Sequence, residues 1–176
     1  MKKTQYLVAS LNPIASLIAM LNNDDGLTRS HARKALVKIG TAAVPSLIQI
    51  LTDPQDRLRW EAAKALSQIG DPTAALALVK ALDDDNSGVR WLAAEGLVPV
   101  GQAGLVPLLE ALKQHSDSVR LREGAHHVLR SLAREDLYAS IVTPVLAVLE
   151  DIEPAIQLPL AAHAALSLLA PALDWH

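Results

Sequence analysis

A twelve-residue segment occurs four times along the chain, without gaps and at a spacing of about thirty residues. All four copies start with arginine, and the first three end with glycine. All four have alanine three positions and leucine seven positions after the arginine. The copies are RSHARKALVKIG (29–40), RWEAAKALSQIG (59–70), RWLAAEGLVPVG (90–101) and REGAHHVLRSLA (122–133). Apolar segments such as PIASLIAML (13–21) and VPSLIQIL (44–51) lie between them. Two such segments in each period are typical of a helical repeat protein.

The apolar residues of the arginine-containing copies follow the period of an α-helix. The positions three, six, seven and ten after the arginine fall on one side of a helical wheel. One helix cannot bury such a stripe alone, so stacked helix pairs would share a continuous core. Gly40, Gly70 and Gly101 end three of the copies, where a left-handed residue closes a helix. Because the chain is also only 3% aromatic and lacks Phe, we predict an all-α fold, an α-α superhelix.

These motifs resemble HEAT repeats, and the short units of the form VRxxAAxxLxxIG are most similar to the phycobilisome-lyase-type HEAT family. The resemblance covers residues 13–170 and implies a right-handed HEAT-like solenoid of about five helical pairs in a single domain. In the last pair Pro159 replaces the arginine, and Ala162, Ala165 and Leu166 are expected to keep the register. We place an N-terminal cap at 1–12 and repeats at 13–40, 41–70, 71–101, 102–133 and 134–173.

The turns that precede the arginine segments are acidic. They read NNDD (22–25), TDP (52–54) and LDDD (82–85). Carboxylates there favour the positive end of the next helix, and we expect them to pair with the arginine that follows. The first helix is expected to begin with Asn12 as N-cap and Pro13 at its first position.

Two rows of outward positions lie one and five residues after each arginine. They are Ser30, Trp60, Trp91 and Glu123 in the first row, and Lys34, Lys64, Glu95 and His127 in the second. The resemblance to HEAT repeats implies that these rows line the concave surface. Trp60 and Trp91 hold equivalent places in adjacent repeats, about 8–10 Å apart, and could form one apolar platform for a peptide or protein partner. Alternatively, each indole folds over the next repeat and only fills packing gaps.

Charge divides this surface into a basic first half and a more acidic second half, which would suit a ligand of mixed charge; an ordinary solvated face is the alternative. The predicted partner-binding residues are Trp60, Trp91, Glu61, Lys64, Leu92, Glu95, Glu123, His127 and Lys34.

The adjacent histidines His126 and His127 point about 100° apart on a helix and cannot easily bind one metal ion together. Glu123 and His127 have i, i+4 spacing, and Glu95 lies one repeat away, so a three-ligand site is conceivable. A modest surface ion pair between Glu123 and His127 is the favoured interpretation, and we predict no metal site. His126 is expected to contact the neighbouring repeat.

Several functional classes are disfavoured by the composition. The chain has no cysteine, and it contains no G-x-S-x-G, phosphate-binding glycine loop or H-E-x-x-H motif, so we predict no catalytic residue, no enzyme activity and no cofactor. The formal charge of -3 disfavours a nucleic-acid partner. The apolar stretch 154–173 is interrupted by prolines, which disfavours a membrane span. We expect a cytoplasmic protein.

Two functions remain open. The preferred one is an adaptor that binds a protein or peptide partner on the concave face. The second, implied by the resemblance, is a bilin lyase-like or chaperone subunit in phycobiliprotein maturation. Deoxyhypusine hydroxylases have a similar architecture, but their repeated His-Glu dipeptides do not occur here. Residues 154–173 carry no charged side chain before Asp174, and they are either covered or available for a homodimer contact.

Overall fold

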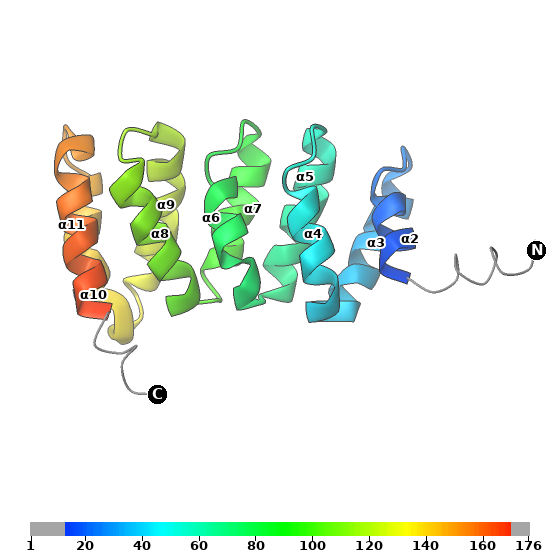
Figure 1. Ribbon diagram of the computed structural model, residues 1–176, viewed down its shortest axis with the longest axis horizontal. Helices are drawn as coiled ribbons and strands as arrows, with labels where there is room; N and C mark the ends of the chain where they lie inside the picture. Colours follow the sequence, from blue (N-terminus) through cyan, green and yellow to red (C-terminus); the bar gives the residue numbers. More distant parts are fainter. Residues whose placement is uncertain (1–12, 170–176) are drawn as a thin grey trace, which may run out of the picture.

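The computed structural model describes residues 13–169, which form helical hairpins stacked side by side in a row (Figure 1). The hairpins are α2 (Pro13–Leu21) with α3 (Gly26–Ile39), α4 (Val44–Ile50) with α5 (Asp56–Ile69), α6 (Ala75–Ala81) with α7 (Ser87–Leu97), α8 (Gln102–Gln114) with α9 (Val119–Leu132), and α10 (Asp136–Leu149) with α11 (Pro154–Leu169). Two short 3-10 helices, η1 (Gly40–Ala43) and η2 (Pro72–Ala74), precede α4 and α6. Residues 13–169 contain no β-strand. The predicted all-α solenoid is confirmed; the predicted N-cap Asn12 lies outside the described residues.

The helices form two rows. The first helices α2, α4, α6 and α8 lie in one row, and the second helices α3, α5, α7 and α9 lie behind them in the view of Figure 1. The second helices pack along their row, with α5 between α3 and α7, and α7 between α5 and α9. We call the outward side of α4, α6 and α8 the first-helix face, and the outward side of α3, α5, α7 and α9 the second-helix face.

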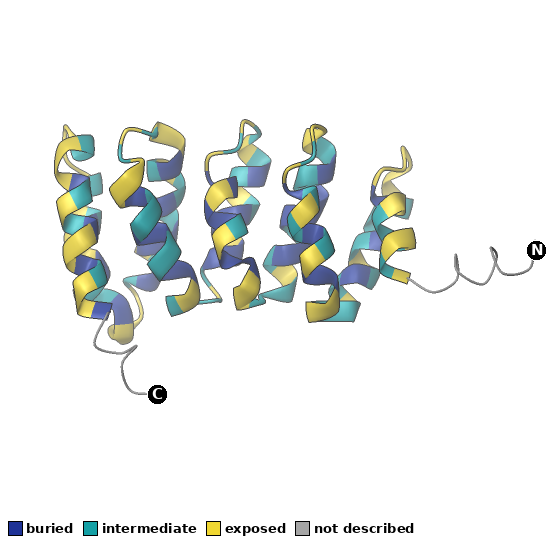
Figure 2. Cartoon of the chain, in the orientation of Figure 1, coloured by how far each residue is buried: buried dark blue, intermediate teal, exposed yellow. Residues whose placement is uncertain are grey.

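The core lies between the two rows and runs through the whole stack (Figure 2). The recurrent alanine and leucine positions predicted to face it are buried in every copy: Ala32, Ala62, Ala93, Ala125, Leu36, Leu66, Leu97 and Leu129. Small residues let the second helices approach closely. A Cβ atom on Gly96 of α7 would lie 3.1 Å from the Cα atom of Ser67 in α5. The alanine-rich stripe therefore sets a tight spacing between neighbouring repeats.

The chain reversals depend on the predicted glycines. Gly40, Gly70 and Gly101 have positive φ angles of 74°, 66° and 56°. The predicted left-handed helix closure is confirmed at Gly70; Gly40 ends α3 with a different ψ of -139°, and Gly101 precedes α8 instead of closing α7, which ends at Leu97. In the fourth repeat Ala133 ends α9 in the ordinary right-handed conformation. Tyr138 of the next helix reaches the preceding hairpin junction, where its hydroxyl accepts a hydrogen bond from the Gln102 backbone amide at 3.1 Å.

The last hairpin is reversed relative to the others. Helix α10 packs beside α9, in the row of second helices, and α11 packs beside α8, in the row of first helices. The sequence predicts that this pair repeats the order of the earlier pairs, and the structure differs on this point. Ala162 and Ala165 are buried as expected, in a helix that packs against α8 and α10.

The exposed side of α11 is an apolar stripe of Ile156, Leu160 and Leu168. A homodimer contact through residues 154–173 stays a prediction, and residues 170–173 lie outside the described part of the chain. Within residues 13–169, no helix combines the length and the apolar character that a membrane crossing requires.

The recurrent arginine donates hydrogen bonds to the turn that precedes its own helix. Arg29 donates from Nη1 to the backbone carbonyls of Asn23 and Asp24, both at 2.8 Å. The equivalent atom of Arg59 donates to two carbonyls of its own preceding turn, at 2.9 and 3.1 Å, and Arg90 does the same at 2.9 and 3.1 Å. This use of the arginine satisfies carbonyl groups that the turn leaves without helix partners.

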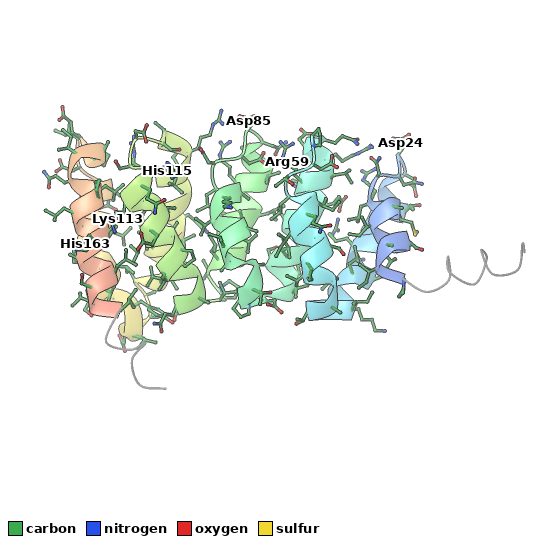
Figure 3. The ribbon with its side chains drawn as sticks, viewed as in Figure 1. Asp24, Arg59, Asp85, Lys113, His115 and His163 are labelled. Atoms are coloured by element: carbon green, nitrogen blue, oxygen red, sulfur yellow. The ribbon has the colours of Figure 1, made fainter. Side chains whose placement is uncertain are left out.

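The acidic side chains of these turns pair with arginines of a neighbouring repeat, either the preceding or the following one, which corrects the prediction that they pair with the arginine following them in sequence. Arg59 bonds the Asp84 carboxylate at 2.7 and 3.0 Å. Arg57 contacts Asp24 at 3.2 Å and Arg120 contacts Asp85 at 2.6 Å. Asp24, Arg59 and Asp85 lie along one edge of the stack in Figure 3. Each pair bridges two hairpins because the turns of successive repeats come together at that edge.

The pKa of Asp84 reflects this environment. Burial alone would raise it, but the hydrogen bonds from the Arg59 guanidinium and the Asn86 backbone amide outweigh burial and lower the pKa below its ordinary value. The carboxylate is therefore charged in the folded chain, and it holds the second and third repeats together.

Candidate functional site

Trp91 is the most exposed aromatic side chain among residues 13–169, with 57% of its surface accessible. Its ring packs against the imidazole of His127 in the next repeat, with ring centroids 4.7 Å apart and planes tilted by 52°. His127 Nε2 lies 2.9 Å from Glu95 Oε1, one turn after Trp91 on α7. Three of the predicted partner-binding residues thus form one cluster that joins α7 to α9. We call Trp91, Glu95 and His127 the tryptophan cluster.

A hollow of about 200 Å³ lies beside this cluster, between α7 and α9. Its lining includes Trp91, His127, Gly124 and Glu123. A second, wider hollow of about 500 Å³ lies between α9 and the α10–α11 turn, and Glu123 lines this one as well. The exposed carboxylate of Glu123 therefore stands between two depressions of the second-helix face. Such a surface offers an apolar contact and a negative charge side by side.

Trp60 has a different environment from Trp91. Its half-buried indole is covered by Arg33, 5.7 Å from the ring centroid, and by Lys64, 4.7 Å from it. The indole also lies against Gly88 of α7, where an added Cβ would come within 3.0 Å of its Cδ1 atom. The packing interpretation therefore describes Trp60, which covers the junction of α5 and α7, while Trp91 presents its ring to the surface.

Glu61 is not on the surface, which corrects its place among the predicted partner-binding residues. Only 4% of it is accessible. Its carboxylate accepts a hydrogen bond from Arg29 Nε at 3.3 Å and a second, very short one from Arg33 Nη1. The residue lies on the side of α5 that packs against α3, so its charge is used within the fold.

The remaining predicted residues differ in accessibility. Leu92 is half-buried and packs against the core, whereas Lys34 is exposed on α3. Lys64 is half-buried and lies over the Trp60 ring. Among the predicted residues, the exposed charged side chain of the basic half is therefore Lys34, and those of the acidic half are Glu95 and Glu123.

The two histidines bind neighbours on opposite sides of α9. His126 Nε2 lies 3.0 Å from Glu150 Oε1 at the end of α10, which confirms the predicted contact with the neighbouring repeat. His127 turns to Glu95 of the preceding repeat rather than to Glu123, so the expected i, i+4 pair is not the one that forms. Among residues 13–169 no three acidic or histidine side chains are grouped closely enough to hold a metal ion.

Sequence reasoning missed Arg33 as a structural residue. It contacts both Glu61 and the Trp60 ring, and it therefore links α3 to α5 at two points. The signal that could have identified it is its position one turn after Arg29, on the same side of the helix.

Comparisons with known proteins agree with this architecture. A family model described as HEAT repeats matches residues 14–98 and 44–130, which together span more than half of the chain. No curated protein sequence matches this chain. Among solved structures, an engineered protein is 22% identical, covers 91% of this chain and 80% of its own, and has a TM-score of 0.47. A designed armadillo repeat protein in complex with the peptide (KR)4 is 19% identical over 89% of this chain and 82% of its own, with a TM-score of 0.44. Another designed armadillo repeat protein is 20% identical over 88% and 82%, with a TM-score of 0.43. The family match, over repeats that fold as stacked helical hairpins, shows that the chain belongs to the HEAT repeat family.

Proposed function

We propose that the chain is a protein-interaction scaffold that binds a segment of a partner protein on the second-helix face and catalyses no reaction. The observation that supports this proposal most directly is the exposure of Trp91. A large aromatic ring in water is a typical binding hot spot, particularly where its position is already fixed before the partner arrives. The contact with His127 holds the ring from one side. In the curvature implied by HEAT repeats, this face is the concave one.

The charges around the tryptophan cluster indicate what kind of segment would bind. Glu123 is exposed and lines both hollows, and Glu95 presents a second carboxylate. The nearest arginines, Arg90 and Arg122, are held at their own turns by hydrogen bonds to backbone carbonyls, although they keep their positive charge. We therefore propose a segment with an apolar or aromatic side chain against Trp91 and a basic side chain close to Glu123. A partner of mixed charge would extend further, toward Lys34.

A peptide-display selection on the immobilised chain tests this proposal, followed by titration of the selected peptides. We expect a consensus that combines an aromatic or large apolar residue with Lys or Arg. Trp91→Ala should weaken binding by at least about tenfold, because removal of a hot-spot residue costs about 2 kcal/mol or more. Trp60→Phe is the matched control, since it changes the packed indole, and it should leave the affinity nearly unchanged.

Either of two results would contradict the proposal. One is selection of peptides whose binding does not change in Trp91→Ala while the variant keeps its helicity. The other is a consensus without basic residues whose affinity does not depend on Glu123→Gln.

The phycobilisome-lyase-type role is a second, more specific proposal, in which the same ring pair would stack against a bilin. The observation that favours it is the exposed ring of Trp91 beside the half-buried imidazole of His127, since a flat conjugated pigment can stack on such a ring. A titration of free bilin, followed by its absorbance spectrum, separates the two proposals. A spectral shift that is lost in Trp91→Ala would support the pigment role, and an unchanged spectrum would refute it.

A further inference from the structure

The first-helix face has two hollows that lie on either side of α6. One, of about 370 Å³, lies between α4 and α6 and is lined by apolar side chains that include Ile48 and Leu51. The other, of about 500 Å³, lies between α6 and α8 and is lined by apolar side chains that include Val79 and Ala111. The three helices stand side by side in Figure 1. Neither hollow includes a residue of the tryptophan cluster, so this surface is separate from the one described above.

Leu76 and Lys80 form the ridge between these hollows, and both residues line both of them. They stand one helical turn apart on α6, so their side chains project from the same line of the helix. Leu76 is 58% accessible although it is a large apolar residue. An exposed leucine between two apolar depressions forms a continuous apolar surface of the kind that marks an interaction site.

The sequence explains why the hollow between α6 and α8 exists. Pro107 lies inside α8 and lines this hollow. A proline in a helix interior has no N–H group for the preceding turn and disturbs the local helix path. Helix α6 has only 7 residues and α8 has 13, so the two do not match along their length. The packing between them is therefore incomplete on the outer side.

Lys80 supplies the unpaired charge of this surface. The acidic side chains around it have other partners: Asp84 binds Arg59 at 2.7 Å, Asp83 accepts from the Ser118 hydroxyl at 2.8 Å, and Glu110 pairs with Lys113 at 3.7 Å. Lys80 is exposed and makes no ion pair with any residue in 13–169. His115, on the rim of the larger hollow, adds no negative charge. The ammonium group of Lys80 is therefore a cation on this surface that a partner carboxylate could bind.

We propose that the first-helix face binds an amphipathic helix of a partner protein, with two apolar side chains seven residues apart and an acidic side chain between them. The spacing follows from the fold. Neighbouring packed helices are about 8–10 Å apart, so the two hollows beside α6 are separated by a similar distance. Seven residues of α-helix advance by about 10.5 Å and return to the same face. The two apolar residues enter the two hollows, and the acidic residue, three or four positions after the first, contacts Lys80.

An extended segment fits this surface less well. Side chains on one side of a strand recur every two residues, at about 6.8 or 13.6 Å along the chain, and neither distance matches two hollows about 10 Å apart. A bound helix would also contact the exposed Leu76, through the part of its apolar face that lies between the two side chains in the hollows. With the tryptophan cluster on the opposite row, the chain would bind two different segments and so join two partners.

A designed peptide tests the proposal. The probe is a fluorescein-labelled, Ala-rich helical peptide of about 18 residues with Leu at positions i and i+7 and Glu at i+4. Binding to the full chain is measured by fluorescence anisotropy. Two control peptides have the same length: in one the second Leu is moved to i+5, on another side of the helix, and in the other Lys replaces Glu.

We expect saturable binding of the Glu peptide to the wild-type chain. The i+5 peptide should bind about tenfold more weakly, because one leucine loses its hollow. Lys80→Glu should weaken the Glu peptide by about fivefold, because a surface ion pair is lost and replaced by repulsion between two carboxylates. The same variant should prefer the Lys peptide, and this exchange of preference would not follow from a general loss of folding.

Trp91→Ala is the matched control on the other row, and it should bind the Glu peptide as the wild-type chain does. The proposal is overturned if the Glu peptide shows no saturable binding up to about 1 mM, if the i+5 peptide binds equally well, or if Lys80→Glu leaves the preference for Glu over Lys unchanged. It is also overturned if Trp91→Ala removes the binding, since the peptide would then lie on the second-helix face.

Discussion

Glu61→Ala should destabilise the chain more than any substitution of an exposed carboxylate, although Glu61 looks like a surface residue in the sequence. The carboxylate is buried between two arginines of α3, at 3.3 Å from Arg29 Nε and still closer to Arg33 Nη1. Its removal would leave two guanidinium groups, with side chains 20% and 12% accessible, facing a gap without negative charge.

The size of the effect follows from what each arginine keeps. Breaking a buried ion pair by removing one partner costs about 3–5 kcal/mol. Arg29 retains two backbone carbonyls, at 2.8 Å each. Arg33 retains the Ser30 hydroxyl at 3.5 Å and the Trp60 ring at 5.7 Å, and its Nε atom is already buried without a hydrogen-bond partner. We therefore expect a loss of about 2–4 kcal/mol in the free energy of unfolding, somewhat below the full range for a buried pair.

Urea unfolding at neutral pH measures this loss, and hydrogen exchange locates it. Glu61 fastens α3 to α5, so the first hairpin should open before the others, as expected when each repeat contacts only its neighbours. Amide exchange should therefore increase in α3 and stay unchanged in α9. Replacing Glu61 by Leu together with Arg33 by Met exchanges the pair for apolar groups, and it should restore stability to within about 1 kcal/mol of the wild type.

Glu123→Ala is the control, because Glu123 is an exposed carboxylate at a similar place of α9. It should change stability by no more than about 0.5 kcal/mol. A loss below about 1 kcal/mol in Glu61→Ala would show that the pair contributes little and would refute the reasoning. An equal increase of exchange in all repeats would refute the assignment of the pair to the α3–α5 junction.

Two further predictions concern the junctions between repeats. Gly88→Ala places a Cβ atom about 3.0 Å from Trp60 Cδ1 and should displace the indole. The overpacked contact should lower the free energy of unfolding by about 1–3 kcal/mol and shift the tryptophan emission to the red. Unchanged emission and stability would show that the indole is not held there. Asp84→Asn removes the carboxylate that Arg59 binds. The folded state lowers the pKa of Asp84 below its ordinary value of 3.8. The stabilisation that this carboxylate gives to the folded state is therefore present above pH 3.8 and is lost as the pH falls through the lower folded pKa. The wild type should therefore be more stable than Asp84→Asn at pH 7, and unfolding curves at successively lower pH should converge; a stability difference independent of pH would contradict the pairing.

The helical repeats and their core could be predicted from local sequence because a helix fixes which side chains share a face. The alanine and leucine positions after each arginine are all buried, and the glycines at 40, 70 and 101 all take positive φ. These properties depend on residues within one or two turns of each other, so a short stretch of sequence contains the necessary information. The surface position of Trp91 could be predicted for the same reason.

The candidate site was only partly predictable because its geometry depends on neighbouring repeats. Trp60 and Trp91 occupy equivalent places on α5 and α7, yet Trp60 lies against Gly88 and beneath two cations, while Trp91 meets His127. The hollows of the first-helix face were not predicted at all. They depend on how closely α4, α6 and α8 approach one another, and the larger hollow also on the unequal lengths of α6 and α8, which no single segment specifies.

The sequence by itself determined the repeating unit, the helical class and the inward face of each second helix, because these follow from the spacing of apolar residues along a 3.6-residue period. Only the tertiary structure decided that Glu61 is buried, that the acidic turns bind arginines of neighbouring repeats, and that α10 and α11 exchange rows in the last hairpin. Each of these outcomes depends on groups about thirty residues apart along the chain that meet across a packed junction. The energy of such a contact depends on distance and burial in space, which a repeating sequence pattern does not contain.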